Sequence, residues 1–258
     1  MSNSKVPFVP DVAASLIARR ARTLGSHVGF VDLDESMRSI IRTVEPYTMT
    51  SGERIAALCT SVDYIIDHGI PGAFVECGVW RGGSLMAILL RLHQRGISDR
   101  DVVGFDTFAG MTKPTGEDVD FQDRAVRSRT WVEALKRVTK LEGSMAFSRD
   151  EVSAVLATTG YAPERIHLVA GPVEDTLPAH APDTVALLRL DTDFYVSTRH
   201  ELEHLYPRIT VGGVLIIDDY GHFKGARKAV DEYLNGHRVL LQRVDYSCRL
   251  AIKQQGDR

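Results

Sequence analysis

Four acidic residues are the feature of this sequence that most directly suggests chemistry. Each comes at or just after the end of a short apolar run: Asp191 ends the run 184–191 and Asp193 comes two residues later, and Asp218 and Asp219 end the run 213–219. Such runs are typical of strands that are buried on both faces of a parallel sheet. Open parallel sheets bind ligands at the edge where the carboxyl ends of the strands meet. We therefore expect the four carboxylates to converge at that edge.

Converging carboxylates need positive charge, because at a partly desolvated site they would repel one another by on the order of several kcal/mol. Oxygen ligands suit Mg²⁺, with Ca²⁺ or Mn²⁺ as alternatives, and the lack of His or Cys at ligand spacing argues against zinc. Asp191 and Asp193 share one side of an extended chain. One of them can therefore bind the metal while the other accepts a proton from a substrate hydroxyl. The alternative is that Asp193 caps a helix beginning near Ser197 and that Asp219 is merely solvated.

The segment FVECGVWRGGSL (74–85) predicts a strand, a tight glycine-containing turn and the start of a helix, with Ser84 as a candidate N-cap. Such a turn brings a ligand close to the backbone at the positive end of a helix. It does not match the dinucleotide pattern G-x-G-x-x-G, because the second glycine comes four residues after Gly78. The Glu76 carboxylate would also repel a pyrophosphate and favours a cationic ligand instead.

Asp106 ends the next strand-like run, 28 residues after Gly78. Doubly wound sheets place an acid at this point against ribose hydroxyls. Together with Glu76, this position indicates S-adenosylmethionine, a nucleoside with a positive amine and sulfonium. Trp80 in the same turn packs either on the cofactor or in the core. The alternative for the whole feature is a structural turn followed by a solvated Asp.

The frame that positions these residues is α/β. Helical stretches alternate with five strand-like runs, at 73–78, 101–106, 165–171, 184–191 and 213–219. A helix over 225–234 and two more runs follow, at 237–244 and 246–253. Because almost nothing separates the last two, they must pair as an antiparallel hairpin. The prediction is a mostly parallel, seven-stranded sheet with an antiparallel C-terminal edge pair and helices on both faces.

Two segments lie outside this frame. Residues 10 to about 70 read as helices, one opening after Asp11 and one at Ser51 that runs toward His68. The connection 107–164 begins as a polar loop and continues with helical stretches near 130–140 and 149–159. Connections of that length are usually lids or binding loops. The acids of the loop, between residues 117 and 123, are expected to be solvated.

Composition bounds the class of protein. The chain has 258 residues, 44% hydrophobic and 25% charged, so it can bury a core. Three widely spaced Cys residues fit reduced thiols, and we expect a cytoplasmic protein. No apolar run approaches the roughly 18 residues of a membrane span, and a net charge of −3 argues against nucleic acid as a partner.

A wider pattern combines these motifs. It comprises FVECGVWRGGS (74–84), FDTFAGM (105–111), GPVEDTLP (171–178), LRLDTDFYVST (188–198) and LYPRITVGGVLIIDDYG (205–221). Together the segments resemble the macrocin-type sugar O-methyltransferases of antibiotic biosynthesis, from about Tyr47 to the C-terminus. The resemblance implies a Rossmann-like class I methyltransferase that uses S-adenosylmethionine and Mg²⁺ to methylate a deoxysugar hydroxyl on a glycosylated natural product. It also implies one domain over 1–258, with a helical extension (1–70) and a core (71–253) that carries a lid insertion (107–165).

Carried over residue by residue, the resemblance implies a metal site, a base and a cofactor site. The metal ligands would be Asp191, Asp218 and Asp219, with Asp193 as the general base. The methionine part of the cofactor would contact Glu76, Gly78 and Ser84, and its ribose would contact Asp106. The similar catechol-type methyltransferases add Met49 and Thr50 as cofactor contacts, with Val173 and Glu174 near adenine. Their Lys base lies where this chain has Phe194, so the role passes to Asp193.

Other functions remain open at this point. The D-x-D of Asp191 and Asp193 also resembles the metal motif of nucleotide-sugar glycosyltransferases, although Glu76 would have no role beside a diphosphate. A catechol-type enzyme acting on a small diol is another alternative. The expected partners are a small glycosylated substrate and a second copy of the chain, as a dimer or larger homo-oligomer, with neither nucleic acid nor membrane.

Overall fold

The computed structural model describes residues 30–126 and 146–256. The chain divides into two units, Met1–Ser39 and Ile40–Arg258, and the site lies wholly in the second. In the described part of the first unit, Asp34 caps the start of α2 (Glu35–Val44) by accepting a hydrogen bond from the backbone N–H of Met37 at 2.8 Å. The helices expected after Asp11 and near 130–140 lie outside the described residues.

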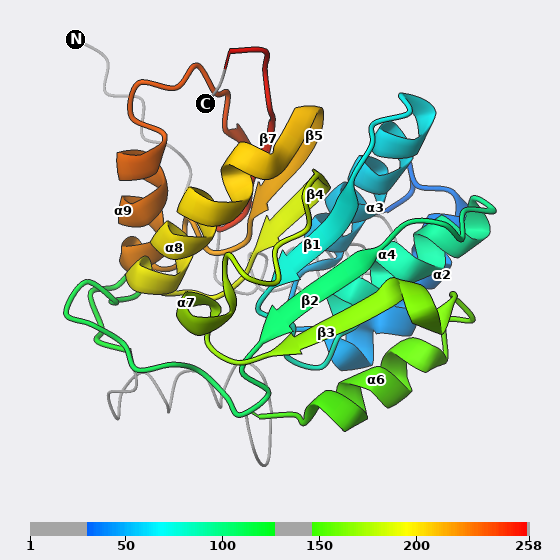
Figure 1. Cartoon of the computed structure of the whole chain (residues 1–258), viewed down its shortest axis with the longest axis horizontal. Coiled ribbons are helices and arrows are strands. Elements are labelled where there is room, and N and C mark those ends of the chain that lie inside the picture. The colour runs from blue at the N-terminus through cyan, green and yellow to red at the C-terminus, as the bar shows by residue number, and fades with distance from the viewer. Residues whose placement is uncertain (1–29, 127–145, 257–258) are drawn as a thin grey trace, which may run out of the picture. The chain divides into compact units, whose positions relative to one another are not determined.

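Seven strands form a mixed sheet in the order β3-β2-β1-β4-β5-β7-β6 within the described part of the chain (Figure 1). They are β1 (Ala73–Cys77), β2 (Val102–Asp106), β3 (Ile166–Ala170), β4 (Val185–Leu190), β5 (Ile209–Ile217), β6 (Gln242–Arg243) and β7 (Arg249–Ile252). β1 to β5 are parallel, whereas β7 runs antiparallel to β5 and to β6. This confirms the expected α/β class and its antiparallel edge. The strand order reverses between β1 and β4, which is where doubly wound sheets bind ligands.

Helices cover both faces of the sheet (Figure 1). One layer contains α3 (Gly52–Asp67), α4 (Gly83–Gln94) and α6 (Arg149–Ala157), and the other contains α7 (Val173–Thr176), α8 (Tyr195–Leu205) and α9 (Lys224–Tyr233). Short 3₁₀ turns lie at Glu45–Tyr47, Pro163–Arg165 and Tyr206–Arg208. β1 and β4 are buried along their whole length, as their mostly apolar sequences predict. Across the described residues, no helix is both long and apolar enough to span a membrane.

Local sequence signals account for several helix ends. The Ser51 hydroxyl accepts a hydrogen bond from the backbone N–H of Arg54 at the start of α3. Ser148 and Glu151 form a capping box at the start of α6. The prediction of Ser84 as an N-cap is wrong, because α4 begins at Gly83 and Ser84 is therefore inside the helix. Its N-cap is Gly82, whose φ of 86° turns the chain in a left-handed conformation that favours glycine.

The acids of the loop after β2 are the clearest correction to the sequence analysis. Asp118 and Asp120 are 1% and 0% exposed, although the sequence predicts a solvated run. Asp118 accepts hydrogen bonds from the backbone N–H of Tyr195 at 2.8 Å and of Thr115 at 2.6 Å, so it caps the start of α8. Asp120 accepts from the backbone N–H groups of Gln122 and Arg124. These bonds hold the first part of the loop, through residue 126, against the body of the domain.

The C-terminal hairpin is shorter than expected. Residues 237–241 lie outside any strand, and β6 has only two residues, whereas β7 has four. β5 is longer than expected, because its pairing begins at Ile209 rather than at Gly213.

Candidate active site

A cavity of about 310 Å³ opens at the carboxyl ends of the parallel strands. Nearly all the residues that the sequence predicts as site residues line this cavity. They are Met49, Thr50, Glu76, Gly78, Trp80, Ser84, Asp106, Val173, Asp191, Asp193, Asp218 and Asp219. Glu174 is the exception, since it lies half-buried on α7 and does not border the cavity. One cavity therefore brings together the glycine-rich turn and the acidic cluster.

Asp106 holds the glycine-rich turn in shape. Its Oδ2 accepts hydrogen bonds from the backbone N–H groups of Val79 at 2.7 Å and Trp80 at 3.0 Å. Its Oδ1 accepts from the backbone N–H of Phe108 at 2.7 Å. A carboxylate has about two acceptor positions on each oxygen. Oδ2 uses both of its positions on the turn, whereas Oδ1 keeps one that can accept a hydrogen bond from a ribose hydroxyl.

Gly78 lies where the end of β1 comes very close to the end of β4. Its φ is 87°, and a Cβ at this position would lie 2.0 Å from the carbonyl oxygen of Asp191. No side chain fits there. The glycine is therefore required for β1 and β4 to bring the turn against the acidic cluster.

Among the buried polar atoms at the cavity that have no hydrogen-bond partner in the described residues, two lie in or beside the glycine-rich turn. They are Oε2 of Glu76 and Nε1 of Trp80. Burial raises the pKa of Glu76 to about 7, although the neighbouring Arg189 opposes that rise. A buried acceptor and a buried donor without partners are costly unless a ligand satisfies them. This arrangement fits a cofactor that carries both a positive amine and hydrogen-bonding groups.

Three carboxylates meet on the other side of the turn. Oxygens of Asp191, Asp193 and Asp219 lie within 4.8 Å of one another, close enough to hold one metal ion. Asp193 reaches this position through a left-handed backbone, with φ of 68°, rather than along an extended strand end. Burial raises the pKa of Asp193 to about 7, and burial together with the adjacent Asp193 raises the pKa of Asp219. A cluster of hard oxygen ligands with excess negative charge suits a divalent cation.

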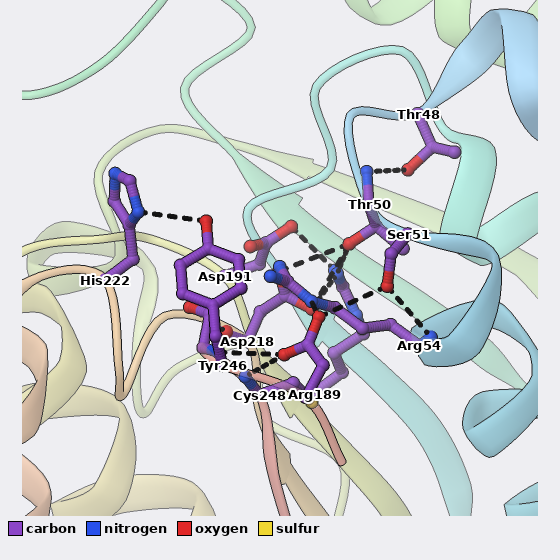
Figure 2. Close-up of polar contacts among 12 residues, drawn as sticks. Thr48, Thr50, Ser51, Arg54, Arg189, Asp191, Asp218, His222, Tyr246 and Cys248 are labelled. Atoms are coloured by element: carbon purple, nitrogen blue, oxygen red, sulfur yellow. Dashed lines mark hydrogen bonds and ion pairs between the residues drawn. The ribbon is translucent and has the colours of Figure 1, made fainter. Parts of the chain in front are cut away.

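The fourth acid, Asp218, is held by cationic side chains (Figure 2). Nη2 of Arg189 donates to its Oδ1 at 2.7 Å, and Nη1 of Arg54 donates to its Oδ2 at 2.6 Å. The hydroxyl of Thr50 also donates to Asp218, at 3.2 Å. Burial opposes ionisation, but these arginines outweigh it and lower the pKa of Asp218. Asp218 is therefore a fixed anion behind the cluster.

Sequence reasoning missed both arginines. Arg189 is 2% exposed and also donates to Glu76 and, at 2.7 Å, to Asp191. One signal could have found it: a charged residue inside the buried run VALLRL must have partners, because an unpaired buried charge is too costly. Arg54 gives no such signal, since it lies near the start of an amphipathic helix.

Comparisons with known proteins decide the family. The model of the family described as "Macrocin-O-methyltransferase (TylF)" matches residues 29–250. The chain belongs to the macrocin O-methyltransferase family. This confirms the resemblance seen in the motifs and makes the protein an O-methyltransferase, so the glycosyltransferase alternative is not supported.

Curated relatives of this macrocin-type enzyme act on antibiotic glycosides, according to their names. The chain is 37% identical over 189 residues to demethyldecarbamoylnovobiocin O-methyltransferase of Streptomyces niveus, covering 72% of this chain and 67% of that protein. It is 32% identical over 193 residues to mycinamicin III 3''-O-methyltransferase of Micromonospora griseorubida, covering 75% and 72%.

Solved structures agree with the macrocin-type fold. The O-methyltransferase NovP matches with a TM-score of 0.68 and 31% identity, over 81% of this chain and 83% of that chain. The calicheamicin methyltransferase CalS11 matches at 20% identity with a TM-score of 0.57, over 98% of this chain and 100% of that chain, and supports the fold alone.

Proposed function

We propose that this enzyme transfers a methyl group from S-adenosylmethionine to a hydroxyl of a deoxysugar on a glycosylated natural product, with the help of a divalent cation. The observation that carries the proposal is that one cavity brings together two buried polar atoms, on Glu76 and Trp80, and a cluster of three carboxylates; the two atoms have no hydrogen-bond partner within the described residues. The names of the relatives, which act on novobiocin and mycinamicin precursors, support a glycosylated acceptor.

The cofactor would lie against the glycine-rich turn. Glu76 accepts a hydrogen bond from its positive amine, and the turn after Gly78 lets its methionine part approach the backbone beside Ser84. Asp106 binds the ribose with the acceptor capacity that its bonds to the turn leave free. Met49, Thr50, Trp80 and Val173 border the same space, and Val173 would contact the adenine. Glu174 has no place in this proposal, because it does not border the cavity.

The cation site follows from the donor set. Asp191 and Asp219 offer oxygen atoms within reach of one ion. Asp218 lies outside that cluster of close oxygens, but after its bonds to Arg189, Arg54 and Thr50 its Oδ1 keeps one acceptor position that would serve as a further ligand. Such oxygen ligands suit Mg²⁺. When bound, the cation would lower the pKa of a coordinated sugar hydroxyl.

Asp193 then acts on the substrate. Its carboxylate accepts the proton of the sugar hydroxyl, and the hydroxyl oxygen forms a bond to the methyl carbon as the bond from that carbon to sulfur breaks. S-adenosylhomocysteine and the methyl ether are the products. The walls of the cavity would position the acceptor hydroxyl against the methyl donor, and such positioning supplies much of the rate enhancement in transfers of this kind.

Calorimetry tests the cofactor part of the proposal. S-adenosylhomocysteine should bind in the absence of added metal with one site per chain, and nucleotide diphosphosugars should not bind. Glu76→Gln should weaken S-adenosylhomocysteine by about tenfold or more, because a charge-assisted hydrogen bond is lost. Binding of a nucleotide diphosphosugar with no binding of S-adenosylhomocysteine would overturn the proposal.

A further inference from the structure

Two exposed apolar side chains border the cavity, and a third lies next to them. Large apolar side chains are rarely exposed in the described part of this chain, and the seven that are include Met49, Phe121 and Tyr246. Met49 and Tyr246 border the cavity, and Phe121 contacts Tyr246 and another bordering residue, His222. Single exposed apolar side chains are common and need no explanation, whereas a group of them at a cavity indicates a ligand-binding surface.

Phe121, His222 and Tyr246 form one aromatic wall. The ring of His222 lies 5.3 Å from that of Phe121 and 5.9 Å from that of Tyr246, and the outer two rings are 6.3 Å apart. A hydrogen bond of 3.1 Å joins Nδ1 of His222 to the hydroxyl of Tyr246 (Figure 2). The guanidinium of Arg54 lies over the Tyr246 ring at 5.5 Å. These contacts fix the three rings relative to one another.

The backbone beneath the wall is also fixed. Phe121 directly follows Asp120. The buried carboxylate of Asp120 accepts hydrogen bonds from Gln122 and Arg124 in the same turn, and its backbone forms a β-bridge with Phe223. Tyr246 lies in the turn between β6 and β7, where Gly221 packs so closely that a Cβ on it would lie 1.9 Å from the Tyr246 carbonyl oxygen. The wall is therefore formed before any ligand arrives, which reduces the entropic cost of binding.

The wall stands beside the acidic cluster rather than beside the glycine-rich turn. The backbone N–H of His222 donates to the carbonyl oxygen of Asp219 at 3.0 Å. A molecule that presents a hydroxyl to Asp193 and Asp219 would therefore place its neighbouring atoms against the rings. Rigid rings provide large apolar contact areas at low conformational cost.

A deoxysugar has the matching chemistry. One edge of the ring carries hydroxyls, whereas the C–H groups and the methyl group of a 6-deoxysugar form an apolar surface. We propose that Phe121, His222 and Tyr246 are the subsite for this apolar surface and that they select deoxysugars over fully hydroxylated sugars. The inference rests on the proposed function, since that function places a sugar at the carboxylates.

Ligand binding and kinetics test the subsite separately. The enzyme saturated with S-adenosylhomocysteine and Mg²⁺ is titrated with methyl L-rhamnoside, a 6-deoxysugar glycoside, and with methyl L-mannoside, which adds one hydroxyl at carbon 6. Saturation-transfer NMR should show contact with the rhamnoside methyl group and ring C–H groups, and binding of the mannoside should be at least about fivefold weaker. No binding of the rhamnoside, or equal binding of both, would overturn the inference.

Variants assign the effect to the wall. Phe121→Ala and Tyr246→Ala should each raise the KM for the glycosylated acceptor about tenfold and change kcat less than about threefold. The affinity for S-adenosylhomocysteine should stay the same. Val211→Ala removes an equally exposed apolar side chain from β5, away from the cavity, and should change none of these values. Should an alanine variant fail to fold, Phe121→Leu replaces it. Leucine keeps apolar bulk but lacks the rigid ring, so it should raise the KM by less than the alanine variant, and an unchanged KM would count against the wall.

The outcomes separate the two proposals. If the acceptor KM is unchanged in both alanine variants, the subsite is overturned but the proposed methyl transfer is not. If the affinity for S-adenosylhomocysteine falls as much as the acceptor KM rises, the wall belongs to the cofactor site and the subsite is likewise overturned. Binding of the rhamnoside that depends on Phe121, without methylation of any glycoside, would overturn the proposed function and leave the subsite standing.

Discussion

Arg189 donates a hydrogen bond to Asp218 across 2.7 Å, and both side chains are almost wholly buried. The same guanidinium also contacts Glu76 and Asp191. One buried cation therefore links the proposed cofactor side of the cavity to the acidic side. Removing one partner of a buried ion pair is costly because an unpaired charge remains.

Arg189→Met should lower the free energy of unfolding by about 3–5 kcal/mol, measured by urea denaturation. Arg199→Met is the matched control, because Arg199 pairs with Glu203 at a similar distance of 2.7 Å but on the surface. That change should cost less than about 1 kcal/mol. Equal losses in the two variants would contradict the role given to Arg189.

Gly78→Ala should destabilise the protein by about 3 kcal/mol or more, because the new Cβ meets the Asp191 carbonyl oxygen and the positive φ disfavours alanine. Gly69→Ala isolates the second effect, since Gly69 has a φ of 60° but nothing within 4 Å of its Cβ position. It should cost about 1 kcal/mol. Thermal and urea unfolding of both variants measure the difference, and equal costs would show that the close approach does not matter.

Glu201 should make stability fall as pH rises. It is fully buried on α8, and burial raises its pKa well above the ordinary value, although the neighbouring Thr192 opposes that rise. Near pH 4 both folded and unfolded chains hold the proton. At higher pH the unfolded chain releases it and the folded chain retains it, so folding becomes less favourable.

Glu201→Gln removes this titration. The variant should match the wild type near pH 4 and exceed its free energy of unfolding by about 1 kcal/mol or more at pH 7.5, since each unit of pKa difference is worth about 1.4 kcal/mol. Urea unfolding at a series of pH values measures the gap. A gap that stays constant with pH would refute the buried, protonated state of Glu201.

Asp193→Asn should reduce turnover by at least about 10²-fold, because an amide cannot accept the hydroxyl proton. S-adenosylhomocysteine should bind as it does to the wild type, as calorimetry can check. Asp123→Asn is the control, since Asp123 is an exposed acid that pairs with Lys224; it should leave turnover unchanged. Normal turnover in Asp193→Asn would assign the base to another group.

Much of the fold was predictable because its signals are local. The apolar runs locate β1 to β5 to within a few residues, and Ser51 marks the start of α3. The gathering of the acids at one edge follows from the rule for parallel sheets. The motifs likewise identify the residues of the glycine-rich turn that border the cavity.

The remaining features depend on contacts between distant segments. Asp118 caps α8 across 77 residues, and Arg54 reaches Asp218 across 164. Nothing in the local sequence distinguishes Asp118 from the solvated acids near it. The left-handed backbone at Asp193 also has no decisive local signal, because Asp adopts this conformation more often than most residues but still uncommonly.

Transfer of labelled methyl tests the central claim most directly. The enzyme is incubated with S-adenosylmethionine labelled in its methyl group and a panel of demethyl deoxysugar glycosides, with and without EDTA. We predict that label appears on a sugar oxygen, that EDTA abolishes the transfer and that added Mg²⁺ restores it. Transfer that EDTA leaves unchanged, or an absence of transfer to every glycoside in the presence of Mg²⁺, would contradict the account.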